Sequence, residues 1–388
     1  TGILATVAGG CSNVVSGLRS TIGGGELNCA TGTQSTVAGG RLNKAIGNKS
    51  AVTGGQNNSA SGNYSGIIGG QTNCTTGSYS VAGGYKAKVT GVASTAFGEG
   101  VSAANNWASV GGGFENCAGS NQSRVGGGCK NLATGSSSFV GGGVQNCSIG
   151  NESTVGGGQY VRACGNRSVA VGGYGNCAIG VQSFVGGGNT NKACETSSTV
   201  AGGGLNTAKK IHGFVGGGYY NYNNGNYGVI VGGISNGINA AANYSVIGGG
   251  ISNATFGSNT AIAGGHYNRA CGDRSFIGGG GQMYKGNITR GIFSSIVGGR
   301  ENMTCGTFSS IGGGECVKVL SAHDFIGGGF SNTTAGSAAV VVGGRNNRAF
   351  GLTSSVVAGS ANDNFGLFSS ILGGCLNRIS PGHDSSFI

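Results

Sequence analysis

Proline and charged residues are scarce in this sequence, and each scarcity excludes a class of protein. Of 388 residues only one is Pro, 11 are acidic, and 9% are charged in total. So few carboxylates exclude a calcium-binding roll, because each of its turns requires several oxygen ligands. No apolar stretch approaches the roughly 18 residues of a membrane-spanning helix, so we expect no membrane span in this segment. The 89 Gly show no Gly-X-Y period, which excludes collagen.

Glycine is abundant instead, and it recurs with a period of fifteen residues. The segment 21–35 (TIGGGELNCATGTQS) is followed by 36–50 (TVAGGRLNKAIGNKS), which matches it residue class for residue class. About 25 such units run from Thr6 to Asp384. Position two is usually Val or Ile, positions four and five are Gly, position eight is Asn, position ten is small, position twelve is Gly, and position fifteen is Ser. A fixed period of this length predicts a repeat architecture.

Fifteen residues are too few for a strand, a crossover helix and a returning strand. Each unit is therefore predicted to be one coil of two short strands, with bends at the Gly positions, where Gly tolerates a positive φ. The sequence predicts an all-β, parallel β-solenoid (β-roll) of about 25 coils of 15 residues, continuous over residues 1–388. In such a stack the Asn at position eight, as in Asn28 and Asn43, passes amide hydrogen bonds from coil to coil.

Three coils depart from the standard length. They are 95–108, 229–245 and 276–294, and the last two are expected to bulge outward as loops. Neither end of the chain carries a recognisable cap, so we expect the solenoid to be open at both ends. Bare sheet edges favour further chain, a partner molecule or end-to-end stacking beyond them.

The stretch 94–103 (STAFGEGVSA) resembles the head repeats of trimeric autotransporter adhesins of the YadA type. Viral and phage fibres carry similar repeats, and the remaining units look like a fifteen-residue variant of the motif. The resemblance implies a left-handed β-roll, three chains around one axis, a location on a cell or virion surface, and adhesion to matrix, cell surface or glycan. The extra residue in each coil, the Gly-Gly pair and the thirteen Cys depart from the pattern.

The thin interior of one roll also favours self-association. Each coil offers little more than one Val or Ile and one small residue such as Ala30 or Ala45. Burying a second face between chains adds apolar area worth about 25 cal/mol per Å². We therefore expect a homotrimer, with a single-chain solenoid that polymerises end to end into a filament as the alternative.

Disulfides are one interpretation of the cysteines. Cys11 and Cys29 lie at positions six and nine of adjacent coils, and Cys129 and Cys147 repeat that relation. Both pairs are candidate disulfides, and Cys164 with Cys177, or Cys177 with Cys194, are further options. The alternative is that these Cys stand in for Ala or Ser as small residues of the ladder. No Cys-x-x-Cys or His-x₃-His spacing occurs, so neither a metal site nor a cofactor is expected.

The repeat itself generates most of the Asn-x-Ser/Thr sequons. If the host is eukaryotic, those at position thirteen are expected to be exposed at a corner and available for glycosylation. They are Asn48, Asn63, Asn121, Asn151 and Asn166.

The net charge of +11 is scattered along the repeat, which argues against nucleic acid as a partner. One local concentration of cations and aromatic residues stands out as a candidate binding surface for sugars, and an interchain contact fits it equally well. It comprises Lys209, Lys210, Tyr219, Tyr220, Tyr222 and Tyr227.

Together these features predict a structural and adhesive segment of an extracellular fibre, whose partners are other copies of the chain and a glycan or cell-surface receptor. It would act by many weak contacts along its length. An ice-binding solenoid would require an unbroken Thr array, but position one changes from Thr36 to Ala51 and Gly66. A polysaccharide-processing enzyme would require paired carboxylates, and none recur at regular spacing. We therefore expect no enzymatic activity.

Overall fold

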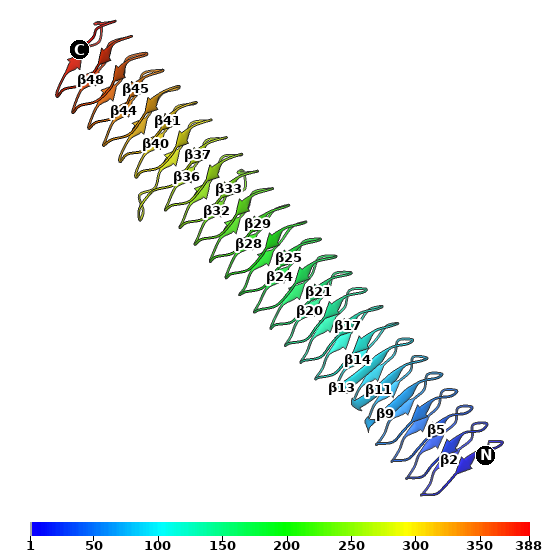
Figure 1. Ribbon diagram of the computed structural model, residues 1–388. Helices are drawn as coiled ribbons and strands as arrows, with labels where there is room; N and C mark the ends of the chain where they lie inside the picture. The colour runs from blue at the N-terminus through cyan, green and yellow to red at the C-terminus, as the bar shows by residue number, and fades with distance from the viewer. Residues whose placement is uncertain (1) are drawn as a thin grey trace. The chain divides into compact units, whose positions relative to one another are not determined.

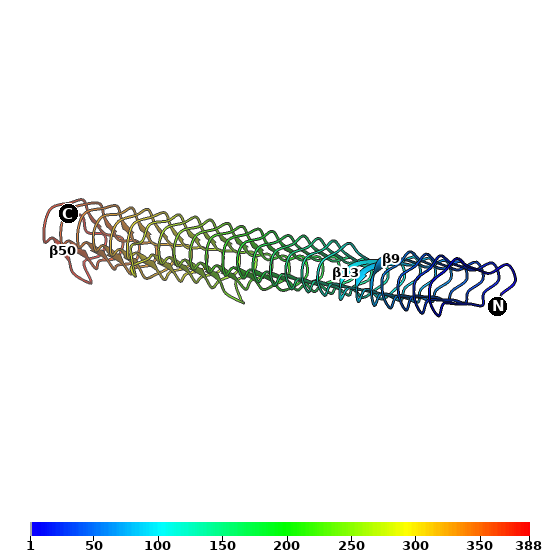
Figure 2. The ribbon, with the colours of Figure 1, turned by 90° about the horizontal axis from the view of Figure 1, so that it is seen from below.

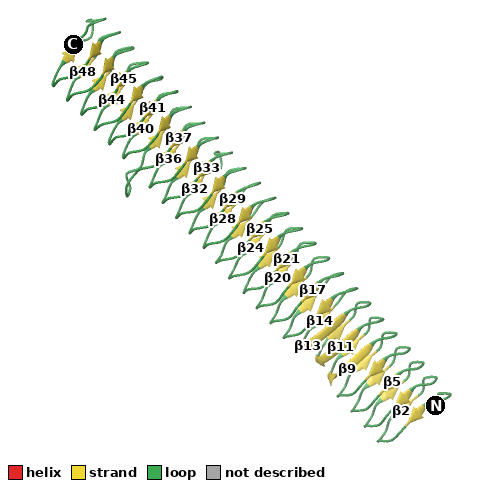
Figure 3. Cartoon of the chain, viewed as in Figure 1, coloured by secondary structure: helices red, strands yellow, loops and turns green. Residues whose placement is uncertain are grey.

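The computed structural model describes residues 2–388, which form short strands joined by bridges, turns, bends and irregular segments, without a helix. The chain divides into two compact units, Thr1–Thr190 (unit 1) and Asn191–Ile388 (unit 2). In each unit the coils stack so that odd-numbered strands form one parallel sheet, sheet A, and even-numbered strands form another, sheet B (Figures 1 and 3). The predicted all-β parallel solenoid of about 25 turns of roughly 15 residues is confirmed.

In unit 1 most strands have two residues. The strands of sheet A are β1 (Thr6–Val7), β3 (Thr21–Ile22), β5 (Thr36–Val37), β7 (Ala51–Val52), β9 (Gly66–Gln71), β11 (Val81–Tyr85), β13 (Thr95–Glu99), β15 (Ser109–Val110), β17 (Arg124–Val125), β19 (Phe139–Val140), β21 (Thr154–Val155), β23 (Val169–Ala170) and β25 (Phe184–Val185). Those of sheet B are β2 (Val14–Val15), β4 (Cys29–Ala30), β6 (Lys44–Ala45), β8 (Ser59–Ala60), β10 (Cys74–Thr75), β12 (Lys88–Val89), β14 (Ser102–Ala103), β16 (Cys117–Ala118), β18 (Leu132–Ala133), β20 (Cys147–Ser148), β22 (Arg162–Ala163) and β24 (Cys177–Ala178).

Unit 2 follows the same plan. Its sheet A strands are β27 (Thr199–Val200), β29 (Phe214–Val215), β31 (Val229–Ile230), β33 (Val246–Ile247), β35 (Ala261–Ile262), β37 (Phe276–Ile277), β39 (Ser295–Ile296), β41 (Ser310–Ile311), β43 (Phe325–Ile326), β45 (Val340–Val341), β47 (Ser355–Val356) and β49 (Ser370–Ile371). Its sheet B strands are β26 (Lys192–Ala193), β28 (Thr207–Ala208), β30 (Tyr222–Asn223), β32 (Gly237–Ile238), β34 (Ala254–Thr255), β36 (Arg269–Ala270), β38 (Ile288–Thr289), β40 (Met303–Thr304), β42 (Lys318–Val319), β44 (Thr333–Thr334), β46 (Arg348–Ala349), β48 (Asp363–Asn364) and β50 (Arg378–Ile379).

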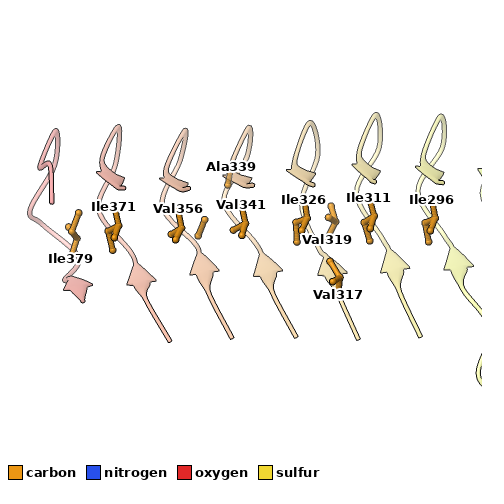
Figure 4. Packing of buried hydrophobic residues seen from close by; sticks show 11 residues of the cluster. Ile296, Ile311, Val317, Val319, Ile326, Ala339, Val341, Val356, Ile371 and Ile379 are labelled. Atoms are coloured by element: carbon orange, nitrogen blue, oxygen red, sulfur yellow. The ribbon is translucent and has the colours of Figure 1, made fainter. Parts of the chain in front are cut away.

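The first residue of almost every strand points outward and the second points inward, as the period of two in a strand requires. Positions two and ten therefore form the apolar interior between the sheets. In unit 2, Ile296, Ile311, Val341 and Ile371 stack at position two, and all are fully buried (Figure 4). The interior is one side chain thick on each sheet, as the composition predicted.

The predicted Asn ladder at position eight is confirmed. Asn43 is fully buried; its Nδ2 donates to the carbonyl of Gly39 at 2.9 Å and to that of Gly55 in the next coil at 2.8 Å. Its backbone N–H donates to Oδ1 of Asn28 in the previous coil at 3.0 Å. Each Asn thus joins the bend after sheet A to the start of sheet B, and both polar atoms of the Asn43 side chain are satisfied, since Oδ1 accepts the Asn58 N–H at 3.1 Å.

The bends differ in one respect from the prediction, which placed them at Gly alone. Gly at position five is required, because Gly40 has a φ of 90° and a Cβ there would lie 2.2 Å from the carbonyl oxygen of Gly55. Positions seven and fourteen are also left-handed, yet they carry ordinary residues such as Leu42 and Lys49, each with a φ of 56°. Their N–H groups donate to carbonyls of the previous coil at 3.0 and 2.8 Å, which offsets the cost of this conformation.

The strand register gives lengths other than fifteen residues to coils 95–108, 229–245 and 276–294. Thr95 pairs with Ser109, Val229 with Val246, and Phe276 with Ser295. Two further irregular coils were not predicted. Val81 pairs with Thr95, so coil 81–94 also has 14 residues, and Ser370 bridges Phe387, so the coil from Ser370 is two residues longer than standard.

Shortening and lengthening act at different places in the coil. Coils 81–94 and 95–108 each lack one residue before the position-five Gly. Their sheet A strands continue through the bend, so β11 and β13 have five residues each and lie beside the long strand β9 (Figure 2). Extra residues enter only at corners. The four extra residues of coil 276–294 lie between Gly281 and Gly286, and the ladder continues past them from Asn287 N–H to Asn268 Oδ1 at 2.9 Å.

Candidate functional site

The outer surface of sheet A consists of positions one and three of each coil and is called the sheet A face. In unit 2, whose residues are all described, no charged side chain lies on it, and Val297, Val342 and Leu372 are 61%, 50% and 53% exposed. In unit 1 the one charged residue at these positions is Arg124. The sheet A face of unit 2 comprises Thr199, Ala201, Phe214, Gly216, Val229, Val231, Val246, Gly248, Ala261, Ala263, Phe276, Gly278, Ser295, Val297, Ser310, Gly312, Phe325, Gly327, Val340, Val342, Ser355, Val357, Ser370 and Leu372.

The outer surface of sheet B consists of positions nine and eleven and is called the sheet B face. In unit 2 it carries most of the cations and one acidic residue, Asp363, which pairs with Arg348. The cations are Lys192, Lys209, Arg269, Arg290, Lys318, Arg348 and Arg378. The two faces of one repeat therefore have opposite surface chemistry.

The structure divides the predicted cation and aromatic cluster among three places. Lys209 and Tyr222 meet on the sheet B face, with Nζ 5.7 Å from the ring centre, beside a shallow hollow that Lys210 also lines. Hydrogen bonding to the Tyr222 hydroxyl raises the pKa of Lys209. Tyr219 and Tyr220 lie at the corner formed by positions six and seven, with ring centres 6.5 Å apart.

Tyr227 lies at the other corner, at position fourteen, and belongs to a different group. Its ring stacks between those of His212 and Tyr244, with ring centres 4.9 Å from each. Because every position-fourteen residue has the same left-handed backbone, neighbouring side chains leave the corner in parallel. Tyr64 and Tyr79 in unit 1, and Phe293 and Phe308 in unit 2, stack in the same way at 4.9 and 4.8 Å.

A second cation and aromatic group, which the sequence analysis missed, surrounds the loop 282–285. A groove of about 460 Å³ lies beside the loop, and its floor is position nine of four successive coils, Arg269, Ile288, Met303 and Lys318. The sequence feature that could have located this group is the four-residue lengthening of coil 276–294, because it marks where the surface departs from the repeat.

The wall of this groove is formed by the rings of Tyr267 and Tyr284, whose centres are 5.0 Å apart at an interplanar angle of 41°. The loop closes on itself through reciprocal backbone hydrogen bonds between Gln282 and Lys285, and Figure 1 shows it projecting beside β36. Lys285 Nζ lies 2.5 Å from Oε1 of Glu301, and this contact lowers the pKa of Glu301.

None of the thirteen cysteines, which all lie within residues 2–388, forms a disulfide in the structure. Register explains why the two predicted bridges are absent. Cys11 lies opposite Glu26 while Cys29 lies opposite Val14, so their backbones are three positions out of line. Cys129 and Cys147 are displaced in the same way, opposite Val144 and Leu132 respectively. A disulfide requires much closer backbones.

Cys164 and Cys177, named as a further option, are brought together on the sheet B face of unit 1. The Cys177 thiol hydrogen-bonds to the Cys164 sulfur, and Arg162 lies beside it; these contacts lower the pKa of Cys164 to about 6. Burial instead raises the pKa of Cys117 and Cys147 on the same face. Cys164 is therefore the thiol with the greatest thiolate character among those whose pKa is shifted.

The five sequon asparagines are all exposed at the position-thirteen corner, as expected. Several form a second, external ladder: Asn48 N–H donates to Oδ1 of Asn63, and Asn151 N–H donates to Oδ1 of Asn166, both at 3.0 Å. The Oδ1 atoms of Asn63 and Asn166 therefore each accept a backbone hydrogen bond. Whether these asparagines are glycosylated stays a prediction.

Over residues 2–388 no group of three or more His, Cys, Asp or Glu side chains is placed to hold a metal ion, and no helix is long and apolar enough to cross a membrane. No family model matches the chain, and no curated protein matches its sequence. The structure is a parallel β-solenoid of repeats, and the resemblance to trimeric adhesin heads and viral fibres stays a prediction.

Proposed function

We propose that this chain is a structural and adhesive segment of an extracellular fibre at a cell or virion surface, that copies associate as a homotrimer, and that it has no catalytic role. The single observation that carries the proposal is the uncharged sheet A face. A surface that stays free of charge over a whole unit, while the opposite sheet carries seven cations, is typical of an interface.

The repeat spacing of this face supports a copy of the same chain as the partner. Twelve coils at about 4.8 Å and a strip about 10 Å wide give unit 2 alone roughly 600 Å². That area is below the about 800 Å² that a standard interface buries on each partner, so area alone does not identify the partner. A partner must match the spacing of side chains that repeat with every coil, and a second copy of the chain has the same spacing because it has the same repeat.

The sheet B face and the two aromatic corners supply the adhesive contacts in this proposal. Cations beside aromatic rings, as in Lys209 with Tyr222, suit acidic sugars, and repetition along the stack multiplies weak contacts by avidity.

Sedimentation velocity at several concentrations, with and without reductant, tests the assembly. The expected mass is three times the 37.6 kDa of one chain, unchanged by reductant because the proposed interface is the non-covalent contact of sheet A faces. A mass of 37.6 kDa at all concentrations would contradict the proposal, and a dimer would contradict the trimer alone.

A further inference from the structure

The groove beside loop 282–285 lies where the longest inserted segment of unit 2 forms a wall next to the sheet B face. Deleting Gln282–Lys285 would restore a coil of standard length, so nothing in the fold of the coil requires these four residues. They are nevertheless held in place. Lys285 pairs with Glu301, and Arg300 donates to Oε1 of Gln282 at 2.5 Å.

The floor of the groove is apolar in its centre and positive at its two ends. Ile288 and Met303 are half-buried between Arg269 and Lys318, and three coil steps separate the two cations by about 14 Å. Within the described residues neither cation forms an ion pair, whereas Lys285 and Arg300 are paired with Glu301 and Glu315. The positive charge available to a ligand is therefore that of Arg269 and Lys318.

We infer that this groove binds an anionic oligosaccharide, with carboxylate or sulfate groups at Arg269 and Lys318 and the faces of sugar rings against Met303, Ile288 and the tyrosine wall. The inference deepens the proposed function and rests on it. Aromatic and aliphatic side chains cover the apolar face of a sugar ring, while the guanidinium of Arg269 offers paired donors to an acidic group.

A single nucleic acid strand fits the groove less well. Its phosphates follow one another closely and require a continuous track of cations with flat stacking platforms. Here two cations are separated by two apolar residues, and the ring planes of Tyr267 and Tyr284 are tilted by 41°.

Calorimetry of the full chain at physiological salt tests the inference. The probes are a heparin hexasaccharide, which is sulfated and carboxylated, a hyaluronan hexasaccharide, which is only carboxylated, the neutral cellohexaose, and a single-stranded hexanucleotide. We expect the acidic sugars to bind, and the difference between them identifies the preferred anionic group. Equal affinity for cellohexaose or tighter binding of the hexanucleotide would overturn the assignment.

Variants locate the site. Arg269→Gln and Lys318→Gln are each expected to weaken hexasaccharide binding about tenfold, as loss of a charged hydrogen bond does. Lys192→Gln removes the same charge from the same position of the sheet B face, but beside the separate hollow of Lys209 and Tyr222, so we expect a smaller loss of affinity than for Lys318→Gln. Deletion of Gln282–Lys285 should abolish binding at the groove while the far-ultraviolet circular dichroism stays that of the parent.

Equal losses for Lys192→Gln and Lys318→Gln, or full affinity after the deletion, would overturn the groove as the site. Sedimentation of the same samples separates this result from failure of the proposed function. A trimer whose groove variants bind like the parent would defeat the groove and leave the fibre, whereas a monomer that binds through Lys318 would defeat the assembly and support the groove.

Discussion

The sheet A face and the sheet B face are built from the same repeat, yet they differ in almost every surface property. In unit 2 the first is free of charge and carries Phe, Val, Ser and Gly, and the second carries Lys and Arg interrupted by Tyr, Met and Ile. Both rest on one shared interior, so the difference cannot come from the requirements of folding. It shows that the outward positions of a solenoid are free to vary, and in the proposed function the two sheets have different roles.

Charge placed on the sheet A face is the most direct way to abolish the difference. Val297→Lys combined with Val342→Lys would put two ammonium groups into the proposed interface, and an unpaired buried charge costs several kcal/mol. We expect sedimentation to show dissociation to single chains. The matched control, Thr207→Lys with Thr333→Lys on the sheet B face, should leave the mass unchanged, and dissociation of the control as well would remove the distinction between the faces.

The Asn ladder supports both faces, so its loss should affect them together. In Asn206→Ala the carbonyls of Gly202 and Gly218 and the N–H of Asn221 lose their partners, all at 2.9 Å. We expect urea unfolding, followed by circular dichroism, to show a loss of roughly 2–4 kcal/mol. Thr207→Ala, the next residue and outward-facing, serves as the control with less than about 0.5 kcal/mol. Equal effects would mean that the ladder adds nothing beyond ordinary packing.

One carboxylate lies directly beneath the sheet A face. Asp324 occupies position fifteen, where Ser is usual, and burial raises its pKa from 3.8 to about 6, although its Oδ1 accepts the Ala339 N–H at 2.8 Å. A raised pKa means that the folded state holds the proton more tightly. The protonated Asp324 carboxyl therefore makes its full contribution to the stability of the folded state below about pH 4, and this contribution is lost as the pH rises through 6.

Asp324→Ser should remove this dependence and raise the free energy of unfolding at pH 7.5 by roughly 1–3 kcal/mol. Urea midpoints at pH 4 and 7.5 provide the measurement. The parent should lose stability relative to the variant between the two values, and a parallel course of the two proteins would show that the carboxyl titrates normally.

The smallest expected effect is confined to the sheet B face of unit 1. Arg162→Gln removes a cation that lowers the pKa of Cys164, so the pKa should rise from about 6 by less than about one unit. Iodoacetamide labelling across pH 5–9, read by mass spectrometry of the Cys164 peptide, gives the midpoint. Cys177→Ala removes the largest contribution and should shift it further. An unchanged midpoint in both variants would show that neither Cys177 nor Arg162 lowers the pKa of Cys164.

The period and its buried positions could be predicted from the sequence because they depend on residue class alone. Val or Ile at position two and Asn at position eight recur often enough to identify the stack and its ladder. The left-handed corners could not be predicted, since Leu42 and Lys49 have no preference for a positive φ and adopt it only because the previous coil supplies acceptors.

The candidate sites were predictable only where the residues lie on the same face of adjacent coils. Lys209 and Tyr222 occupy outward positions of adjacent sheet B strands and do meet, whereas Tyr227 is carried to the far corner. The groove between Arg269 and Lys318 depends on residues three coils apart and on the direction taken by an inserted loop, which a repeat pattern does not contain.

The corner between positions six and seven accepts four additional residues in coil 276–294 without a break in either sheet or in the ladder. Every coil has the same corner, so the molecule offers a series of equivalent attachment points at a fixed pitch. A foreign peptide grafted at one of them would be displayed at a chosen height, and several grafts would be held at spacings set by whole numbers of coils. The same tolerance lets such a chain change what it recognises by lengthening one corner at a time, while the scaffold beneath stays constant.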